Sequence, residues 1–300
     1  MVQLMTRVTA PDDSATPEQQ VTLDDSSLDG LPEIPEAPGV LERLRRLEGE
    51  RRAAFSQMHR MVADIGMLRS VNERWIQGQE QARIEGMYRM ALLAEFRQGG
   101  SPAKVLRTGV MGALLANAIG GETAYCDRLQ VALPLADIGE IGLPDSLLQA
   151  PVWGAEQRAA MQAHCAIGHA LLDGSRVPEI RMAAEIALTH HERFDGRGYP
   201  QGLHGPAIPL AGRIAAVVDC FDAMTCARPD RTAVTPELAL QMVAEQQGSA
   251  FDPLVIDALL GIGKVICAVR WVLDDASAQP ETLACLGKPP EAGFWRRFLN

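Results

Sequence analysis

The sequence predicts an all-α protein, and three observations support this fold class. Between Val40 and Gln98, apolar residues recur at heptad-like steps, as they do along one face of a helix. Further segments with helical spacing follow, several of them bounded by glycine or proline. The alternation of apolar and polar residues that marks half-buried strands is scarce. With 47% apolar residues, the chain of 300 residues can also build a packed core.

Composition excludes several classes of function. The formal net charge is −10, so we expect no polymeric nucleic acid partner, although a few arginines could still hold a small anionic ligand. The six cysteines form no CxxC pair and no zinc-type spacing, which favours free thiols in a reducing compartment. The first residues lack the apolar segment of a signal peptide, and Lys264 and Arg270 interrupt the apolar stretch Leu259–Leu273. We therefore expect a cytoplasmic protein without a membrane span.

The chain divides into four expected regions. Residues 1–38 are rich in proline, aspartate, serine and threonine, which predicts a disordered acidic tail. Residues 39–98 predict a helical stalk, residues 99–262 the main helical domain, and residues 263–300 a C-terminal extension.

The stalk pattern has apolar residues on one side and mostly charged residues elsewhere. Its apolar positions are Leu41, Leu44, Phe55, Met58, Val62, Ile65 and Ile76. Polar residues interrupt this register at Glu48, Arg51, Arg69 and Asn72. Gly66 and Gly78 also weaken a continuous helix. A stalk that pairs in a homodimer is the preferred interpretation, and an intramolecular helical hairpin stays open as an alternative.

In the main domain, one helix is expected to begin after Gly99-Gly100, with Ser101 as its N-cap and Pro102 in its first turn. The most informative stretch comes later, between residues 188 and 231. It carries the pair His190-His191, a glycine-rich loop, a helix that presents Asp219, and two arginines. Imidazoles and carboxylates are the ligands that first-row transition metals prefer, and guanidinium groups bind phosphate oxygens.

Residues 87–262 resemble the HD-GYP family, a subgroup of the HD metal-dependent phosphohydrolases. The stretch HHERFDGRGYPQGLHG carries most of the resemblance, together with the segment ADIG that contains Asp137. The resemblance implies an HD-type helical bundle that acts on cyclic di-GMP with divalent metals, commonly iron or manganese. Metal ions in such a site polarise the phosphodiester and activate water.

Carried over position by position, the resemblance implies five metal ligands: Asp137, His164, His190, His191 and Asp219. Asp137 would bridge two metals, the three histidines would complete the shell of one metal, and Asp219 would belong to the other. His169 lies five residues after His164, about 140° around the helix, so it is expected to face elsewhere.

The resemblance also implies ligand contacts outside the metal site. Arg228 and Arg231 would contact the phosphates of cyclic di-GMP. The interaction loop of Gly198, Tyr199 and Pro200 would contact a protein partner.

Three positions depart from the family pattern. Lys104 and Ala136 stand where the family has metal-binding histidines, and Glu140 stands where it has a lysine. Asp137 and Glu140 are therefore the candidate catalytic carboxylates, and one or two metal ions are expected. Two functions stay open: a cyclic di-GMP phosphodiesterase with weak or lost hydrolysis, and a non-catalytic cyclic di-GMP receptor or protein-interaction adaptor.

Overall fold

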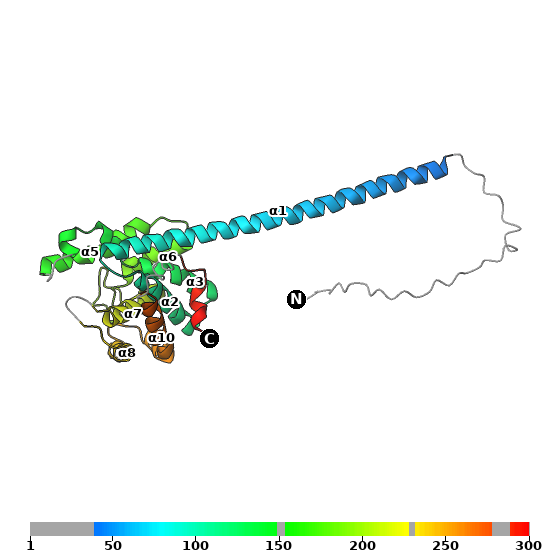
Figure 1. Cartoon of the computed structure of the whole chain (residues 1–300). Coiled ribbons are helices and arrows are strands. Elements are labelled where there is room, and N and C mark those ends of the chain that lie inside the picture. The colour runs from blue at the N-terminus through cyan, green and yellow to red at the C-terminus, as the bar shows by residue number, and fades with distance from the viewer. Residues whose placement is uncertain (1–38, 149–153, 228–231, 278–288, 300) are drawn as a thin grey trace. The chain divides into compact units, whose positions relative to one another are not determined.

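The computed structural model of the chain confirms the all-α prediction (Figure 1). It describes residues 39–148, 154–227, 232–277 and 289–299. Within these ranges the regular elements are helices and 3-10 turns, and β-type pairing is limited to the isolated bridges Asp195–His204 and Gln247–Phe251. The predicted acidic tail, residues 1–38, lies outside the described residues.

One long helix precedes a bundle of shorter ones. The α-helices are α1 (Val40–Arg97), α2 (Pro102–Ala118), α3 (Thr123–Ala132), α4 (Asp145–Leu148), α5 (Ala155–Leu172), α6 (Pro178–Thr189), α7 (Leu210–Thr225), α8 (Pro236–Ala244), α9 (Pro253–Gly261) and α10 (Gly263–Ser277). The 3-10 turns are η2 (Leu133–Leu135), η3 (Ile138–Gly142), η4 (Gly205–Ala207) and η5 (Phe294–Phe298). Among the described helices, none combines the length and the apolar character that crossing a bilayer would require.

Helix α1 is continuous over its 58 residues, so Gly66 and Gly78 do not interrupt it. The alternative of an intramolecular hairpin in this region is therefore wrong. The chain divides into two compact units within α1, one ending at Leu68 and the other beginning at Arg69. In the second unit, the last turns of α1 contribute Met87 and Tyr88 to the core.

Helix α2 lies at the centre of the bundle, and almost all its side chains from Val105 to Ala116 are buried. It packs against α3, α7 and α10. As predicted, Ser101 caps α2, with its hydroxyl accepting a hydrogen bond from the N–H of Ala103 at 3.2 Å, and Pro102 occupies the first turn. The packing against α3 is close at Gly109, where a Cβ atom would stand 2.3 Å from the carbonyl oxygen of Gln130.

A buried ion pair joins α2 to α7. The guanidinium of Arg107 donates two hydrogen bonds to the carboxylate of Asp222, from Nε at 2.7 Å and from Nη2 at 3.2 Å. The two side chains are 3% and 2% exposed. Because both charged groups are buried, the attraction between them offsets the hydration free energy that each has lost.

The C-terminal residues also pack on the bundle. Trp295 in η5 is 2% exposed, its indole N–H donates to Asp127 at 2.7 Å, and its backbone N–H donates to the side chain of Gln130. The predicted C-terminal extension therefore includes residues that contact α3.

Replacing Asp222 with Ala should destabilise the protein strongly, because it removes the carboxylate that compensates the buried charge of Arg107. We expect the free energy of unfolding to fall by about 3–5 kcal/mol, measured by urea denaturation followed by circular dichroism. Asp145→Ala is the matched control, because Asp145 pairs with Arg97 at 2.8 Å while its side chain is 71% exposed. The control should change stability by less than about 1 kcal/mol. Equal losses in the two variants would contradict this interpretation of the buried pair.

Candidate metal centre

Asp137 lies between the 3-10 turns η2 and η3, where the backbone approaches α5 very closely. At Gly139 there is no room for a side chain, because a Cβ atom would stand 1.9 Å from the carbonyl oxygen of His164. Gly168 faces it from α5, and a Cβ atom there would stand 3.2 Å from the backbone nitrogen of Gly139. This contact between two backbone segments brings Asp137 beside His164.

Two histidines reach the site from different helices. His164 comes from α5, and His190 is the C-cap residue of α6. In each ring Nδ1 lies near a backbone carbonyl oxygen of its own helix, 2.6 Å from Met161 for His164 and 3.0 Å from Ile186 for His190. A hydrogen bond from Nδ1–H to these carbonyls leaves Nε2 free as an electron-pair donor. Metal-ligating histidines are commonly oriented in this way.

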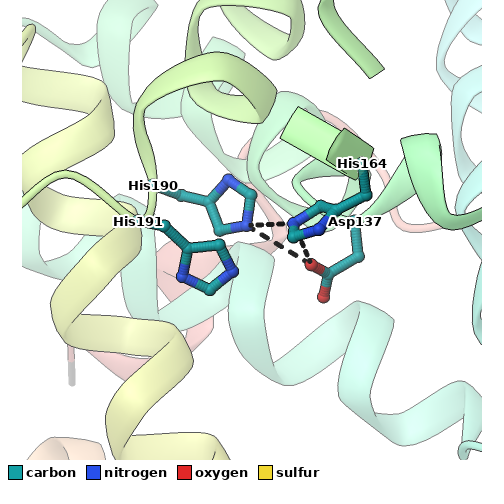
Figure 2. A group of neighbouring side chains, drawn as sticks. All are labelled: Asp137, His164, His190 and His191. Carbon is teal, nitrogen blue, oxygen red and sulfur yellow. Dashed lines mark hydrogen bonds and ion pairs between the residues drawn. The ribbon is translucent and has the colours of Figure 1, made fainter. Parts of the chain in front are cut away.

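The free nitrogens converge on Asp137 (Figure 2). Nε2 of His190 is 3.3 Å from Oδ1 of Asp137, and Nε2 of His164 is 3.8 Å from the same oxygen. The two Nε2 atoms are 3.4 Å apart. With His191 included, each of the four residues offers one ligand atom, and these atoms lie within 4.8 Å of one another. Four of the five predicted ligands thus meet at one point, in a set that fits a divalent transition metal.

Burial favours the neutral form of two of these imidazoles. Burial, reinforced by the neighbouring His190, lowers the pKa of His191 to about 2, and burial also lowers the pKa of His164. Burial acts in the same direction on His190, but the hydrogen bond to Asp137 and the charges of Asp137 and Asp219 together outweigh it and raise the pKa of His190. Metal coordination requires the neutral imidazole, so His164 and His191 are prepared for it and His190 would release a proton.

The other oxygen of Asp137 faces a lysine. Nζ of Lys104 is 3.3 Å from Oδ2 of Asp137 and 3.3 Å from Oε2 of Glu95. Burial disfavours a charge on Lys104, but the carboxylates of Asp137, Asp219 and Glu95 outweigh it and raise the pKa of the ammonium above its ordinary value. Burial opposes the charge of Asp137, but Lys104 and His190 together outweigh burial and lower the pKa of Asp137 well below its usual range. Lys104 is therefore protonated at neutral pH and lies beside Oδ2 of Asp137.

Asp219 and Glu140 complete the surroundings of Lys104. Asp219 lines a small cavity, of about 20 Å³, that Lys104, Asp137, Glu95 and Ala136 also line. It lies outside the cluster of four ligand atoms that includes Asp137. Glu140 is 7% exposed, and burial, followed by the charge of Asp137, raises its pKa to about 8. Burial and the charge of Asp137 likewise raise the pKa of Asp219.

The sequence interpretation missed Glu95 as a residue of this site. Glu95 is buried on the face of α1 that also carries Tyr88 and Ala91. A charged residue on an apolar helical stripe was the available signal, since residues three, four and seven apart share one face. Arg228 and Arg231 lie outside the described residues.

The predicted interaction loop is anchored beside the cluster. The Tyr199 ring lies 4.8 Å from that of His191, centroid to centroid. The buried carboxylate of Glu192 accepts hydrogen bonds from three successive backbone N–H groups, those of residues 201, 202 and 203, at 2.7, 3.1 and 3.0 Å. Gly198 is needed for close approach, because a Cβ atom there would stand 2.3 Å from the nitrogen of Arg193. Pro200 is exposed at the surface of the loop, where contact with a protein partner stays a prediction.

Comparison with known proteins places the chain in a family. The family model described as "HD domain" matches residues 93–255, so the chain belongs to the HD domain family. Two curated relatives support the narrower HD-GYP assignment. The cyclic di-GMP phosphodiesterase response regulator RpfG of Xanthomonas campestris is 38% identical, over 80% of this chain and 61% of the relative. A cyclic di-GMP phosphodiesterase of Thermotoga maritima is 34% identical, over 71% of this chain and 58% of the relative.

A third relative has a different stated specificity. The 3'3'-cGAMP-specific phosphodiesterase 2 of Vibrio cholerae is 35% identical, over 64% of this chain and 37% of the relative. This chain spans about three fifths of the length of the first two relatives and less of the third.

Replacing His190 with Ala should remove the metal that the cluster is predicted to hold. His190 supplies a nitrogen at the point where the four ligand atoms converge, so we expect metal affinity to fall by more than about 100-fold. The metal content of protein loaded with manganese or iron(II) under nitrogen, measured by mass spectrometry of the metal, checks this. His169→Ala is the control, because His169 contacts the carbonyl oxygen of Ala184 at 3.2 Å and is not part of the cluster. An unchanged metal count in His190→Ala would refute the ligand assignment.

Proposed function

We propose that this chain binds cyclic di-GMP beside one divalent transition metal, iron or manganese, and hydrolyses it slowly or not at all. The proposal is supported by curated relatives that are named as cyclic di-GMP phosphodiesterases. It is also supported by the convergence of Asp137, His164, His190 and His191. A metal bound by this cluster would polarise a phosphodiester oxygen of the substrate.

One observation carries the claim of weak or lost hydrolysis, namely the ammonium of Lys104 against Asp137 at 3.3 Å. In the HD-GYP pattern this position and that of Ala136 belong to histidine ligands. Lys104 offers no electron pair while it is protonated, and alanine offers none at all. The half of the site next to Asp219 therefore retains carboxylates and has gained a fixed positive charge, which disfavours a second cation there.

The residues of this chain still suit an anionic ligand. Lys104 places a positive charge next to the cluster, and Arg228 and Arg231 follow α7 in the sequence at the positions that the family uses for phosphate contacts. A lysine acts as a point charge, however, so it cannot reproduce the directed coordination of the attacking and leaving oxygens. Glu140 is the remaining candidate for proton transfer, because its pKa of about 8 lets it carry a proton at neutral pH.

Turnover of cyclic di-GMP by anaerobically purified protein tests the proposal. With iron(II) or manganese added, we expect slow formation of linear dinucleotide or GMP, detected by chromatography, or nucleotide binding without turnover. His190→Ala should abolish any turnover. Rapid hydrolysis that survives His190→Ala would contradict the proposed site, and failure to bind cyclic di-GMP would contradict the proposed ligand. 3'3'-cGAMP serves as the competing ligand, because one relative is specific for it.

Restoring histidine at both altered positions tests the role of Lys104 and Ala136. Lys104→His with Ala136→His should raise the metal content from about one to about two ions per chain and increase turnover, because it returns two imidazoles and removes the fixed cation. Ala136→His alone is the control. It should raise the metal content and the turnover less than the double variant does, because Lys104 still faces Asp137. An unchanged metal content in the double variant would show that these two residues do not limit the site.

A further inference from the structure

The N-terminal part of α1 carries many exposed apolar side chains. Ile65 is 62% exposed and Leu68 is 68% exposed. The large apolar side chains of this part that are at least 45% exposed are Val40, Leu41, Leu44, Leu47, Phe55, Met58, Met61, Val62, Ile65, Met67, Leu68, Val71, Trp75 and Ile76. A helix with a continuous apolar face gains most of its stability from packing that face against a partner.

These side chains fit one heptad register, with Leu44 at position a and Leu47 at position d. The a and d positions are then Leu44, Leu47, Arg51, Ala54, Met58, Met61, Ile65, Leu68, Asn72 and Trp75. Every exposed apolar side chain of this part except Met67 falls at a, d, e or g. We call the face formed by the a and d positions the seam. This register differs from the one read from the sequence, which began with Leu41 and placed Glu48 and Arg69 in the seam. Those two residues now lie at e, on its flank.

The two polar residues of the seam are informative. A single Asn at position a specifies pairing register and oligomeric state in parallel coiled coils, and Asn72 occupies such a position. Arg51 also lies at a. Its neighbour at the preceding g position is Glu50, so in a parallel pair Arg51 of one helix would lie beside Glu50 of the other.

We propose that α1 mediates self-association, with the α1 helices of two copies of this chain pairing in parallel and in register over residues 44–75. In this arrangement a residue at g faces the following e residue of the second helix. The g-to-e pairs include Arg43 with Glu48 and Asp64 with Arg69, both of opposite charge. The others are Glu50 with Phe55, Gln57 with Val62, and Val71 with Ile76, and none of them places like charges together.

This charge pattern identifies the partner as a second copy. Each attractive pair is formed twice when two identical helices align in register, and Asn72 then meets Asn72 of the second copy. Residues on the opposite face, at b, c and f, include Arg45, Arg52, Arg60 and Arg74, which suits exposure to water. Gly49 and Gly66 also lie at f and b, where they leave the seam intact. The inference does not depend on the proposed binding of cyclic di-GMP.

The mass of the full chain in solution tests the proposal. We expect light scattering coupled to gel filtration to give twice the mass of one chain. Leu68→Glu, at position d, should shift the protein to the mass of one chain. Met67→Glu is the matched control, because Met67 is 69% exposed, next to Leu68, but lies at position c. It should remain a dimer, and circular dichroism should show that both variants keep their helical content.

Three results would overturn the proposal: a monomeric wild-type protein, equal effects of Leu68→Glu and Met67→Glu, or a larger oligomer. The parallel register is tested separately by introducing one additional cysteine at a time into the full chain. Asn72→Cys should form a disulfide-linked dimer on mild oxidation, because two a positions at the same level bring Cα atoms within about 7 Å. Glu73→Cys, at position b, and the unaltered chain should not crosslink. Crosslinking of Glu73→Cys but not Asn72→Cys would exclude the register.

Discussion

The carboxylate of Asp137 is the interaction on which the candidate site depends. One of its oxygens faces the Nε2 atoms of His164 and His190, and the other faces the ammonium of Lys104. A buried carboxylate is costly unless opposite charge and hydrogen bonds compensate it. Lys104 and His190 supply that compensation, so Asp137 keeps its charge while the nearby carboxyl groups of Glu140 and Asp219 have raised pKa values. The ionised form of Asp137 is thus favoured, and ionisation of the neighbouring carboxyl groups of Glu140 and Asp219 is disfavoured.

Backbone packing holds this carboxylate in place. The contact of Gly139 with α5 leaves no space for a side chain, so the turn that carries Asp137 cannot move away from His164 without losing the contact. The buried pair of Arg107 and Asp222 joins α2, which carries Lys104, to α7, which carries Asp219. On the other side of the cluster, Glu192 fixes the loop that brings Tyr199 against His191. The elements that carry the site are therefore joined to one another by close packing, a buried ion pair and hydrogen bonds.

The two sides of Asp137 fit the proposal that this site holds one metal. The histidine side keeps the donor set that a divalent transition metal prefers. On the other side, Lys104 already provides a cation, and Glu95 from α1 provides a second partner for it. An ammonium in place of a metal ion still offsets the charge of the carboxylates, but it cannot provide directed coordination, since it interacts as a point charge. Binding of an anionic nucleotide is less sensitive to this change than hydrolysis, which requires precise placement of the reacting oxygens.

The sequence by itself determined the fold class, the start of α2 at Ser101 and Pro102, and, through the family resemblance, Asp137 and the three histidines whose ligand atoms lie close to it. Helix periodicity and capping residues are local features that a sequence displays directly, whereas the metal ligands were implied by the resemblance to the HD-GYP family. Only the tertiary structure decided that Glu95 pairs with Lys104, and that Asp219 lines a small cavity together with Lys104 and Asp137. It also decided that α1 is continuous and that Trp295 packs on α3. Such pairings join residues far apart in the chain, and the distance between them is set by how helices pack, which local spacing does not encode.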